Sequence, residues 1–288
     1  MDDSLLILSD EVLVYICEIS HKRETCRLMR SCQRLYGLRA IIKFHGWVDL
    51  KNILHFPLYN SFTHVRANGL TISAMKRQKR ALPCATTHLI LQNFIGYLRT
   101  ITRHLQFLTH LILAHSCKIT VKPGCLPRTV THLTWNIVQK LSIGVLHEGL
   151  LSLRITDYIY LHMVLPSTLQ ILHLKGCFTR IYSDMLPTGL LLLSLDGNVA
   201  FDKDTIPVTV KKMIFGKNFN SYQPIIDYIP MTVKTCIFWD NRLLWLYEQV
   251  DPAKIPQCRI KFIKPMPMYS HPDLTLHQAI LMASGNQP

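Results

Sequence analysis

The sequence lacks the motifs that usually mark an enzyme or a metal site. It contains no HExxH, no GxSxG, no phosphate-binding glycine loop and no pair of carboxylates in a catalytic pattern. Its 9 cysteines form no CxxC pair and no Cys/His group at zinc spacing. We therefore predict a protein that is not an enzyme and that uses no cofactor and no metal.

Acidic residues are scarce as well. The chain has 18 Asp and Glu against 32 Lys and Arg, which gives a formal net charge of +14. This excess favours acidic partners, whether proteins, nucleic acid or anionic lipid. Apolar residues make up 49% of the chain and charged residues only 17%, so the composition excludes a largely disordered protein.

No apolar run is long and free of polar groups. The charge-free stretch from 158 to 174 contains His162, Pro166 and His173, which argues against a membrane span. The start, MDDS, lacks the basic region of a signal peptide, and sparse cysteines in an odd number are typical of reduced thiols. We expect a cytoplasmic protein without a membrane partner, with the nucleus as the alternative location.

The first fifty residues show helical periodicity. Apolar residues recur at intervals of three and four at Leu8, Val12, Tyr15, Ile16 and Ile19, and the run Ser-Asp-Glu before them supplies a capping residue and acids. This predicts a helix over about 10–19. A second pattern over 28–38 leads us to expect two or three short helices packed as a small bundle.

From residue 82 the sequence repeats itself. The clearest units are LPSTLQILHLKGCF from Leu165, LPTGLLLLSLDGNVAF from Leu186, IPVTVKKMIFGKNF from Ile206 and IPMTVKTCIFWDN from Ile229. The position of the Pro, here called the slot, falls at 83, 105, 127, 147, 166, 187, 207 and 230, with steps of 19 to 23 residues. A unit this short cannot enclose its own apolar face, so neighbouring units must stack and share one core.

Within each unit the apolar residues alternate. At positions three, six and eight after the slot, 23 of 24 residues are apolar, and Thr86 is the exception. At positions five, seven and nine, only 8 of 24 are apolar. This period of two predicts a short strand in which positions six and eight face the interior and positions five, seven and nine face solvent. A Pro at the slot suits the entrance of such a strand, because it has no N–H to donate.

The helical segment resembles an F-box. The corresponding text is LLILSDEVLVYICEI followed by HKRETCRLMRSCQRLYGL, over about residues 5–45, with Ser9 in place of the usual Pro. The resemblance implies docking on a Skp-type adaptor of a cullin-based ubiquitin ligase. It assigns Cys32 and Leu35 to helix packing. It assigns the adaptor-binding surface to Leu8, Glu11, Val12, Ile16 and Ile19.

The repeated unit, LPxxLxxLxLxxxF, is similar to the FNIP repeat, which belongs with the leucine-rich repeats. The similarity covers about residues 82–240, with Phe178, Phe201 and Phe219 at the Phe of the family. An F-box-like head before FNIP-type repeats is an arrangement of large-DNA-virus and amoebal proteins. It implies an α+β fold, in which an N-terminal F-box-like helical bundle precedes a leucine-rich-repeat-like parallel β-sheet solenoid.

This fold divides the chain into four parts. Residues 1–46 are the F-box-like helical domain, and 47–81 are a linker with a degenerate first repeat, because SFTHVRANG resembles TTHLILQNF. Residues 82–264 form the FNIP-type solenoid. The tail, 265–288, is expected to hold an extended stretch and a short capping helix.

The solvent-facing row of the sheet is the expected partner surface, as in other solenoids. Arg and Trp are common at binding hot spots, and an ordinary solvated sheet face remains the alternative. We predict that the target is bound by His132, Thr134, Arg154, His173, Lys175, Asp196 and Trp239.

Two other groups have simpler interpretations. His88, His110 and His132 recur at one repeat position, which indicates inheritance of the repeat rather than a metal ladder. The basic run Lys76, Arg77, Lys79 and Arg80 suggests a nuclear-import signal or a phosphate contact, or else a solvated linker.

The sequence therefore favours a non-enzymatic adaptor, in which the head binds a Skp-type subunit and the solenoid binds a protein to be ubiquitinated. Two alternatives stay open. One is a plain interaction scaffold whose head only caps the solenoid, and the other is a basic solenoid that binds nucleic acid.

Overall fold

The computed structural model describes residues 8–20, 22–31, 33–137, 141–156, 165–176, 179–182, 184–202, 204–220, 228–239 and 258–262. The predicted capping helix at the end of the chain, Cys32 and Phe178 lie outside these residues, as does the side chain of Ile19. Among the described residues, the helical elements are α1 (Asp10–Ile19), α2 (Lys22–Ser31), α3 (Gln33–Gly37), η2 (Leu38–Ala40), α4 (Leu50–Ile53), η3 (Tyr59–Ser61), α5 (Gly69–Arg77) and α6 (Arg99–Thr102).

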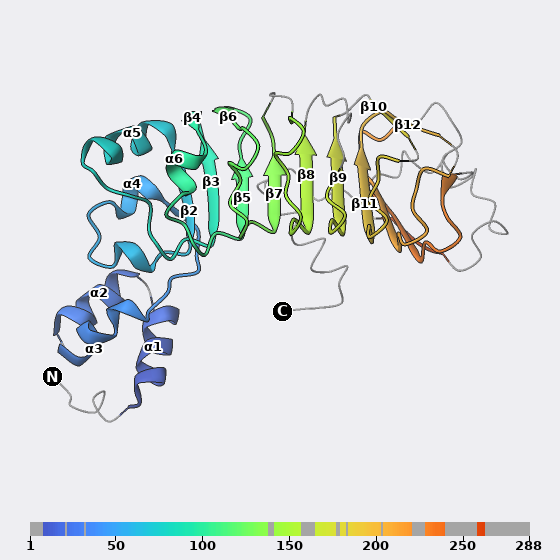
Figure 1. Ribbon diagram of the computed structural model, residues 1–288. Helices are drawn as coiled ribbons and strands as arrows, with labels where there is room; N and C mark the ends of the chain where they lie inside the picture. The colour runs from blue at the N-terminus through green and yellow to red at the C-terminus, as the bar shows by residue number, and fades with distance from the viewer. Residues whose placement is uncertain are drawn as a thin grey trace.

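An eleven-stranded parallel sheet forms the body of the described structure, and its strands follow one another in chain order (Figure 1). Two smaller parallel sheets pair β4 (Ile95–Tyr97) with β6 (Lys118–Thr120) and β10 (Thr179–Ile181) with β12 (Val199–Phe201). The main sheet contains β1 (Val48–Asp49), β2 (His64–Asn68), β3 (His88–Gln92), β5 (His110–Leu113), β7 (His132–Trp135), β8 (Ser152–Thr156), β9 (Ile171–Lys175), β11 (Leu192–Asp196), β13 (Lys212–Phe215), β14 (Thr235–Phe238) and β15 (Arg259–Phe262).

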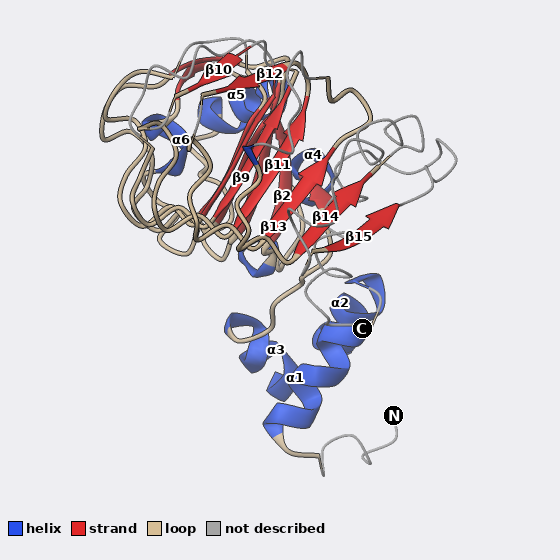
Figure 2. Ribbon diagram, turned by 90° about the vertical axis from the view of Figure 1, so that its right-hand side faces the viewer, coloured by secondary structure: helices blue, strands red, loops and turns tan. Residues whose placement is uncertain are grey.

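The register confirms that the chain is a leucine-rich-repeat-like parallel solenoid. Equivalent positions of neighbouring repeats lie opposite one another, as in Leu111↔Leu133 between β5 and β7 and Leu193↔Met213 between β11 and β13. The segment SFTHVRANG forms β2, which pairs with β3 in the same register. Helices α5 and α6 and strands β10 and β12 lie on one side of the main sheet (Figure 2).

The inner face of the sheet is buried as the alternation predicts. All 24 residues at positions three, six and eight after the slots have an exposed fraction of 2% or less. Thr86 is buried with them, and its hydroxyl donates to the carbonyl of Pro83 at 2.7 Å. The one polar exception is therefore satisfied within its own turn.

The Pro at the slot lies in a turn before the strand and not at the entrance of the strand. Pro83 precedes β3 by five residues, and its carbonyl accepts from the N–H of Thr86 at 3.1 Å. Every later slot makes the same bond to the residue three positions on, and Val210 and Val233 both donate at 3.0 Å. The prediction that the Pro lies at the strand entrance is therefore wrong: it begins the β-turn that leads to the strand.

The opposite face of the sheet, here called the open face, departs from the prediction in its C-terminal half. His173, Leu192, Ser194, Ile214 and Ile237 were expected to face solvent, but all five are buried. Three of them, Leu192, Ile214 and Ile237, form an apolar cluster of their own. Polar-apolar alternation fails there because this part of the sheet is buried on both faces.

The N-terminal helices join the solenoid through a shared core. Helix α1 contacts α2, and α2 contacts α3. Arg34 of α3 pairs with Asp10 at 2.6 Å, and the buried hydroxyl of Thr25 donates to the Cys17 carbonyl at 2.9 Å. Ser9 precedes α1 as predicted, but its side chain makes no capping bond to the backbone. The buried side chains of the helices belong to the same apolar cluster as the solenoid core.

Gly69 lies where the segment after β3 packs against the first residue of α5. A Cβ on Gly69, the first residue of that helix, would overlap the backbone carbonyl of Asn93. We expect Gly69→Ala to lower the free energy of unfolding by about 1 to 3 kcal/mol, measured by urea denaturation. Gly37→Ala is the control, since its site is open and its φ is −61°. Equal stability of the two variants would contradict the close approach.

Candidate binding surfaces

A ladder of four stacked imidazoles covers the N-terminal half of the open face. The rings of His64, His88, His110 and His132 lie parallel, with centroids 4.0, 4.0 and 4.1 Å apart. From the sequence, His88, His110 and His132 were recognised as one repeat position, but His64 was not included with them. A recurring Thr-His dipeptide, present in all four repeats, was the available signal.

The threonines of these dipeptides fix the histidine tautomer. The hydroxyl of Thr109 donates to the carbonyl of Thr87 at 3.2 Å, so it accepts from Nδ1 of His110 at 2.9 Å. Equivalent bonds occur in the other three repeats. Ring planes within 13° of one another direct their Nε2 lone pairs in parallel, so the ladder does not converge on one metal ion.

Trp47 lies at the N-terminal end of the ladder. Its ring meets His64 edge to face at a centroid distance of 5.2 Å, and the Arg66 guanidinium lies 5.7 Å from the Trp47 ring. Burial and the neighbouring His45 lower the pKa of His64. This end of the open face therefore presents stacked aromatic rings next to a cation.

The strand register brings the predicted target-binding residues onto one face. Thr134, Arg154 and His173 lie opposite one another on β7, β8 and β9, and Lys175 lies opposite Asp196. Six of the seven predicted residues are half-buried, namely His132, Thr134, Arg154, Lys175, Asp196 and Trp239.

His173 does not belong to an exposed surface. It is 5% exposed, and neither ring nitrogen has a hydrogen-bond partner among the residues that the structure describes. Burial, with a further contribution from Arg154, lowers its pKa to about 3. The imidazole is thus neutral at physiological pH and cannot anchor an acidic target as a cation.

Positive charge predominates on the open face. The described strands place Arg66, Arg154, Lys175, Lys212, Arg259 and Lys261 on it, against Asp49 and Asp196. Burial and the proximity of Lys261 lower the pKa of Lys212. Asp196 accepts from the N–H of Asn218 at 2.8 Å, so its carboxylate is already hydrogen-bonded. The face fits a partner with negative charge.

Helix α1 buries one side and exposes another. Leu13 and Cys17 are 2% and 1% exposed, whereas Val12 and Tyr15 are 42% and 63% exposed. Of the predicted adaptor-binding residues, Glu11 and Val12 are exposed, and Leu8 and Ile16 are half-buried. Tyr15 was not assigned to this surface from the sequence, although it follows Val12 at the helical interval of three.

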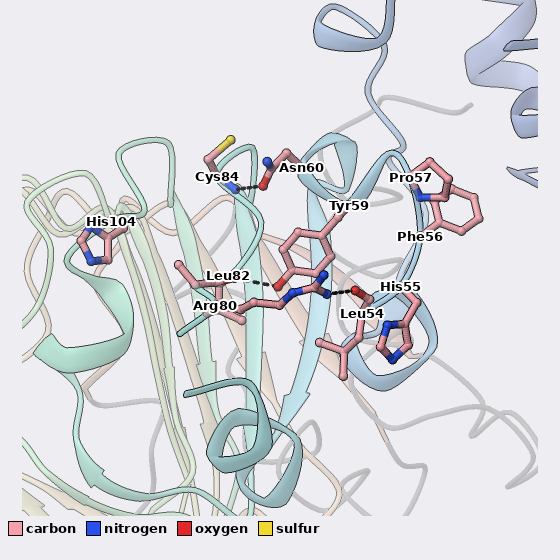
Figure 3. Close-up of a pocket in the computed structure, with 11 residues that line it drawn as sticks. Leu54, His55, Phe56, Pro57, Tyr59, Asn60, Arg80, Leu82, Cys84 and His104 are labelled. Carbon is pink, nitrogen blue, oxygen red and sulfur yellow. Dashed lines mark hydrogen bonds between the residues drawn. The ribbon is translucent and has the colours of Figure 1, made fainter. Parts of the chain in front are cut away.

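A basic depression lies at the N-terminal end of the solenoid, at a distance from α1 along the chain. A hollow of about 670 Å³ is lined by residues 54–57, 59, 60, 80–82 and 84 and by His104 (Figure 3). A second hollow, of about 410 Å³, shares Arg80, Ala81, Leu82 and His104 with it. We call the two together the basic hollow. Three residues of the predicted basic run, Lys76, Lys79 and Arg80, therefore line a concavity, whereas Arg77 does not.

Other site types are absent from the described part of the chain. Within it, no group of three or more His, Cys, Asp or Glu side chains could hold a metal ion. Nor does any helix there combine the length and the apolar character that crossing a bilayer requires.

Comparison with known proteins gives a structural likeness but no family. No family model and no curated protein matches the sequence. Among solved structures, the chain is similar to CroV588, described as a novel circular LRR protein, with 17% sequence identity and a TM-score of 0.36. The match covers 66% of this chain, which spans only 38% of the length of that protein.

Proposed function

We propose that the protein is a non-enzymatic adaptor of a cullin-based ubiquitin ligase. In this proposal the F-box-like head binds a Skp-type subunit through α1, and the FNIP-type solenoid holds the target on its open face. The chain supplies proximity and orientation, and other subunits perform the transfer of ubiquitin.

The exposed side of α1 is the observation on which the proposal depends. Val12 and Tyr15 add apolar surface next to Glu11, on a helix whose other side is already packed. An apolar helix face of this kind fits a groove on a partner. Hydrogen bonds from the backbone N–H of Glu11 itself and from the Ser9 hydroxyl lower the pKa of Glu11, so the Glu11 carboxylate stays charged beside that apolar surface.

The charge of the open face suggests the chemistry of the target. An acidic segment would meet Arg154 and Lys175, and Trp239 adds an aromatic contact beside the apolar cluster of Ile214 and Ile237. Such a segment would associate faster at low salt than at high salt, because complementary charge steers the encounter.

We expect Val12→Asp combined with Tyr15→Asp to abolish binding of a purified Skp-type protein, a loss of at least about 100-fold in affinity. Two buried charges in an apolar interface explain the loss. Titration calorimetry on the full chain measures it. Val208→Asp combined with Met231→Asp is the matched control, because these apolar side chains are 68% and 72% exposed on the solenoid.

The control variant should bind as the unmodified protein does. Failure of the unmodified chain to bind any Skp-type protein, under conditions in which a known F-box protein binds, would refute the proposal. The head would then be only a cap, and deleting residues 1–45 would unfold the repeats, because the two parts share one core.

A further inference from the structure

The basic hollow draws its cations from two successive repeats. Lys76, Lys79 and Arg80 come from the end of α5 and the turn after it, and Arg103 comes from the segment after α6. Neither hollow has an Asp or Glu in its lining. The sequence explains why, since residues 50–147 contain 12 Lys and Arg and no acidic residue.

These cations are held in place by neutral groups. The Lys76 ammonium donates to the Thr100 hydroxyl at 3.3 Å, and the Arg80 guanidinium donates to the Leu54 carbonyl. Arg103 donates to Nε2 of His104 at 2.8 Å. None of the three forms an ion pair with a carboxylate among the described residues, so their full charge acts on the hollow.

The turn after α5 also helps to direct Lys79 and Arg80 toward the hollow. Lys79 has a φ of 55°, in the left-handed region that favours glycine, and the N–H of Arg80 donates to the Met75 carbonyl at 3.0 Å. The chain thus leaves α5 abruptly and directs both basic residues to the hollow. In Figure 3 the Arg80 guanidinium lies beside the Tyr59 ring. The Tyr59 hydroxyl donates to the Ala81 carbonyl at 2.7 Å.

Aromatic side chains accompany the cations. Tyr59 lines the hollow itself, and Tyr97 and Phe107, in the segments on either side of α6, are 55% and 61% exposed but line neither hollow. The Thr100 hydroxyl, which lines the second hollow, donates to the Tyr97 carbonyl at 2.8 Å. Cations bind phosphates, and exposed aromatic rings stack on bases that are not paired. An acidic peptide would use the cations but would leave the rings without a role.

We propose that the basic hollow binds the phosphate backbone of single-stranded nucleic acid, with Lys76, Lys79 and Arg103 contacting phosphates. This site is separate from α1 and from the open face, so it does not depend on the adaptor function.

Fluorescence anisotropy with a labelled oligouridylate of about 12 nucleotides tests the proposal on the full chain. The probe should bind at near-physiological salt. The variant Lys76→Gln, Lys79→Gly and Arg103→Gln should bind at least about tenfold more weakly, and the slope of log affinity against log salt should fall by about 2. The φ of Lys79 suits glycine, so this change does not strain the turn.

The matched control is Lys211→Gln, Lys217→Gln and Lys234→Gln, which removes the same charge from exposed positions far along the solenoid. It should stay within about twofold of the unmodified affinity. Equal losses in both triple variants would show that only net charge matters and would overturn the proposal. Absence of binding, or displacement of the probe by polyglutamate as readily as by unlabelled oligouridylate, would overturn it as well.

If the first triple variant is less stable, Lys79→Gly and Arg103→Gln are measured singly. Each should lower the salt slope by about 0.7, the value for one phosphate of a single strand. An unchanged slope in both would refute the proposed contacts.

Discussion

Leu153→Ala should lower the free energy of unfolding by about 2 to 5 kcal/mol, since it removes a fully buried side chain from the middle of the shared core. Leu153 lies between Leu133 and Leu172 of the neighbouring strands and is 0% exposed. Each repeat depends on its neighbours, so the loss should also weaken the packing of the repeats before and after β8. Urea denaturation followed by circular dichroism measures it.

Leu191→Ala is the matched control for that experiment. Leu191 immediately precedes β11 and is 44% exposed, so the same truncation there should change the stability by less than about 0.5 kcal/mol. A loss below about 1 kcal/mol at Leu153 would mean that its side chain is not part of a packed interior.

His173→Leu should stabilise the protein and flatten its response to acid. Replacing a buried imidazole that has no hydrogen-bond partner among the described residues with an apolar side chain of similar size should raise the unfolding free energy by about 1 to 3 kcal/mol at neutral pH. The effect should grow as the pH falls.

The sign follows from the pKa of His173, which is about 3 in the folded protein and near 6.5 in the unfolded chain. Below about pH 6.5 the unfolded chain binds a proton that the folded protein does not bind, so stability decreases by about 1.4 kcal/mol per pH unit down to about pH 3. His173→Leu should remove this part of the slope.

Denaturation by urea at several pH values between neutral and about 5 measures the slope. Leu191→Ala, which changes no ionisable group, should keep the slope of the unmodified protein. Identical slopes for His173→Leu and the unmodified chain, or a less stable His173→Leu at neutral pH, would contradict the burial of a neutral imidazole at this position.

The inner face was predictable because a strand has a fixed period of two. Apolar residues at positions six and eight after the slot, such as Leu111 and Leu193, had to share an interior once the repeats were recognised as stacked. Burial of the second face was not predictable in the same way. Ser194 and His173 are polar, and the period of a strand carries no information about what covers its other side.

The basic hollow shows a different limit. Its lining comes from three segments, at 54–60, 75–84 and 100–104, which only the stacking of successive repeats brings together. A search for a local motif finds the basic run at the end of α5 but not Arg103 or Tyr59. The absence of acids from 50 to 147 was the signal that spans all three segments.

The two proposed functions can fail separately. The α1 variant should keep its affinity for the oligonucleotide, because Val12 and Tyr15 do not line the basic hollow. The basic triple variant should keep its affinity for a Skp-type protein. Loss of both activities in either variant would indicate misfolding rather than loss of a site.

Cysteine substitution along β8, followed by thiol labelling and peptide mass spectrometry, tests the stacked-repeat architecture most directly. Cysteines at 153 and 155 should react only after unfolding, because these positions are 0% exposed, whereas those at 152 and 156 should react in the native protein. Alternation of protection along the strand is the predicted result. Uniform labelling, or protection that recurs every three to four residues as in a helix, would contradict a shared interior built from repeated strands.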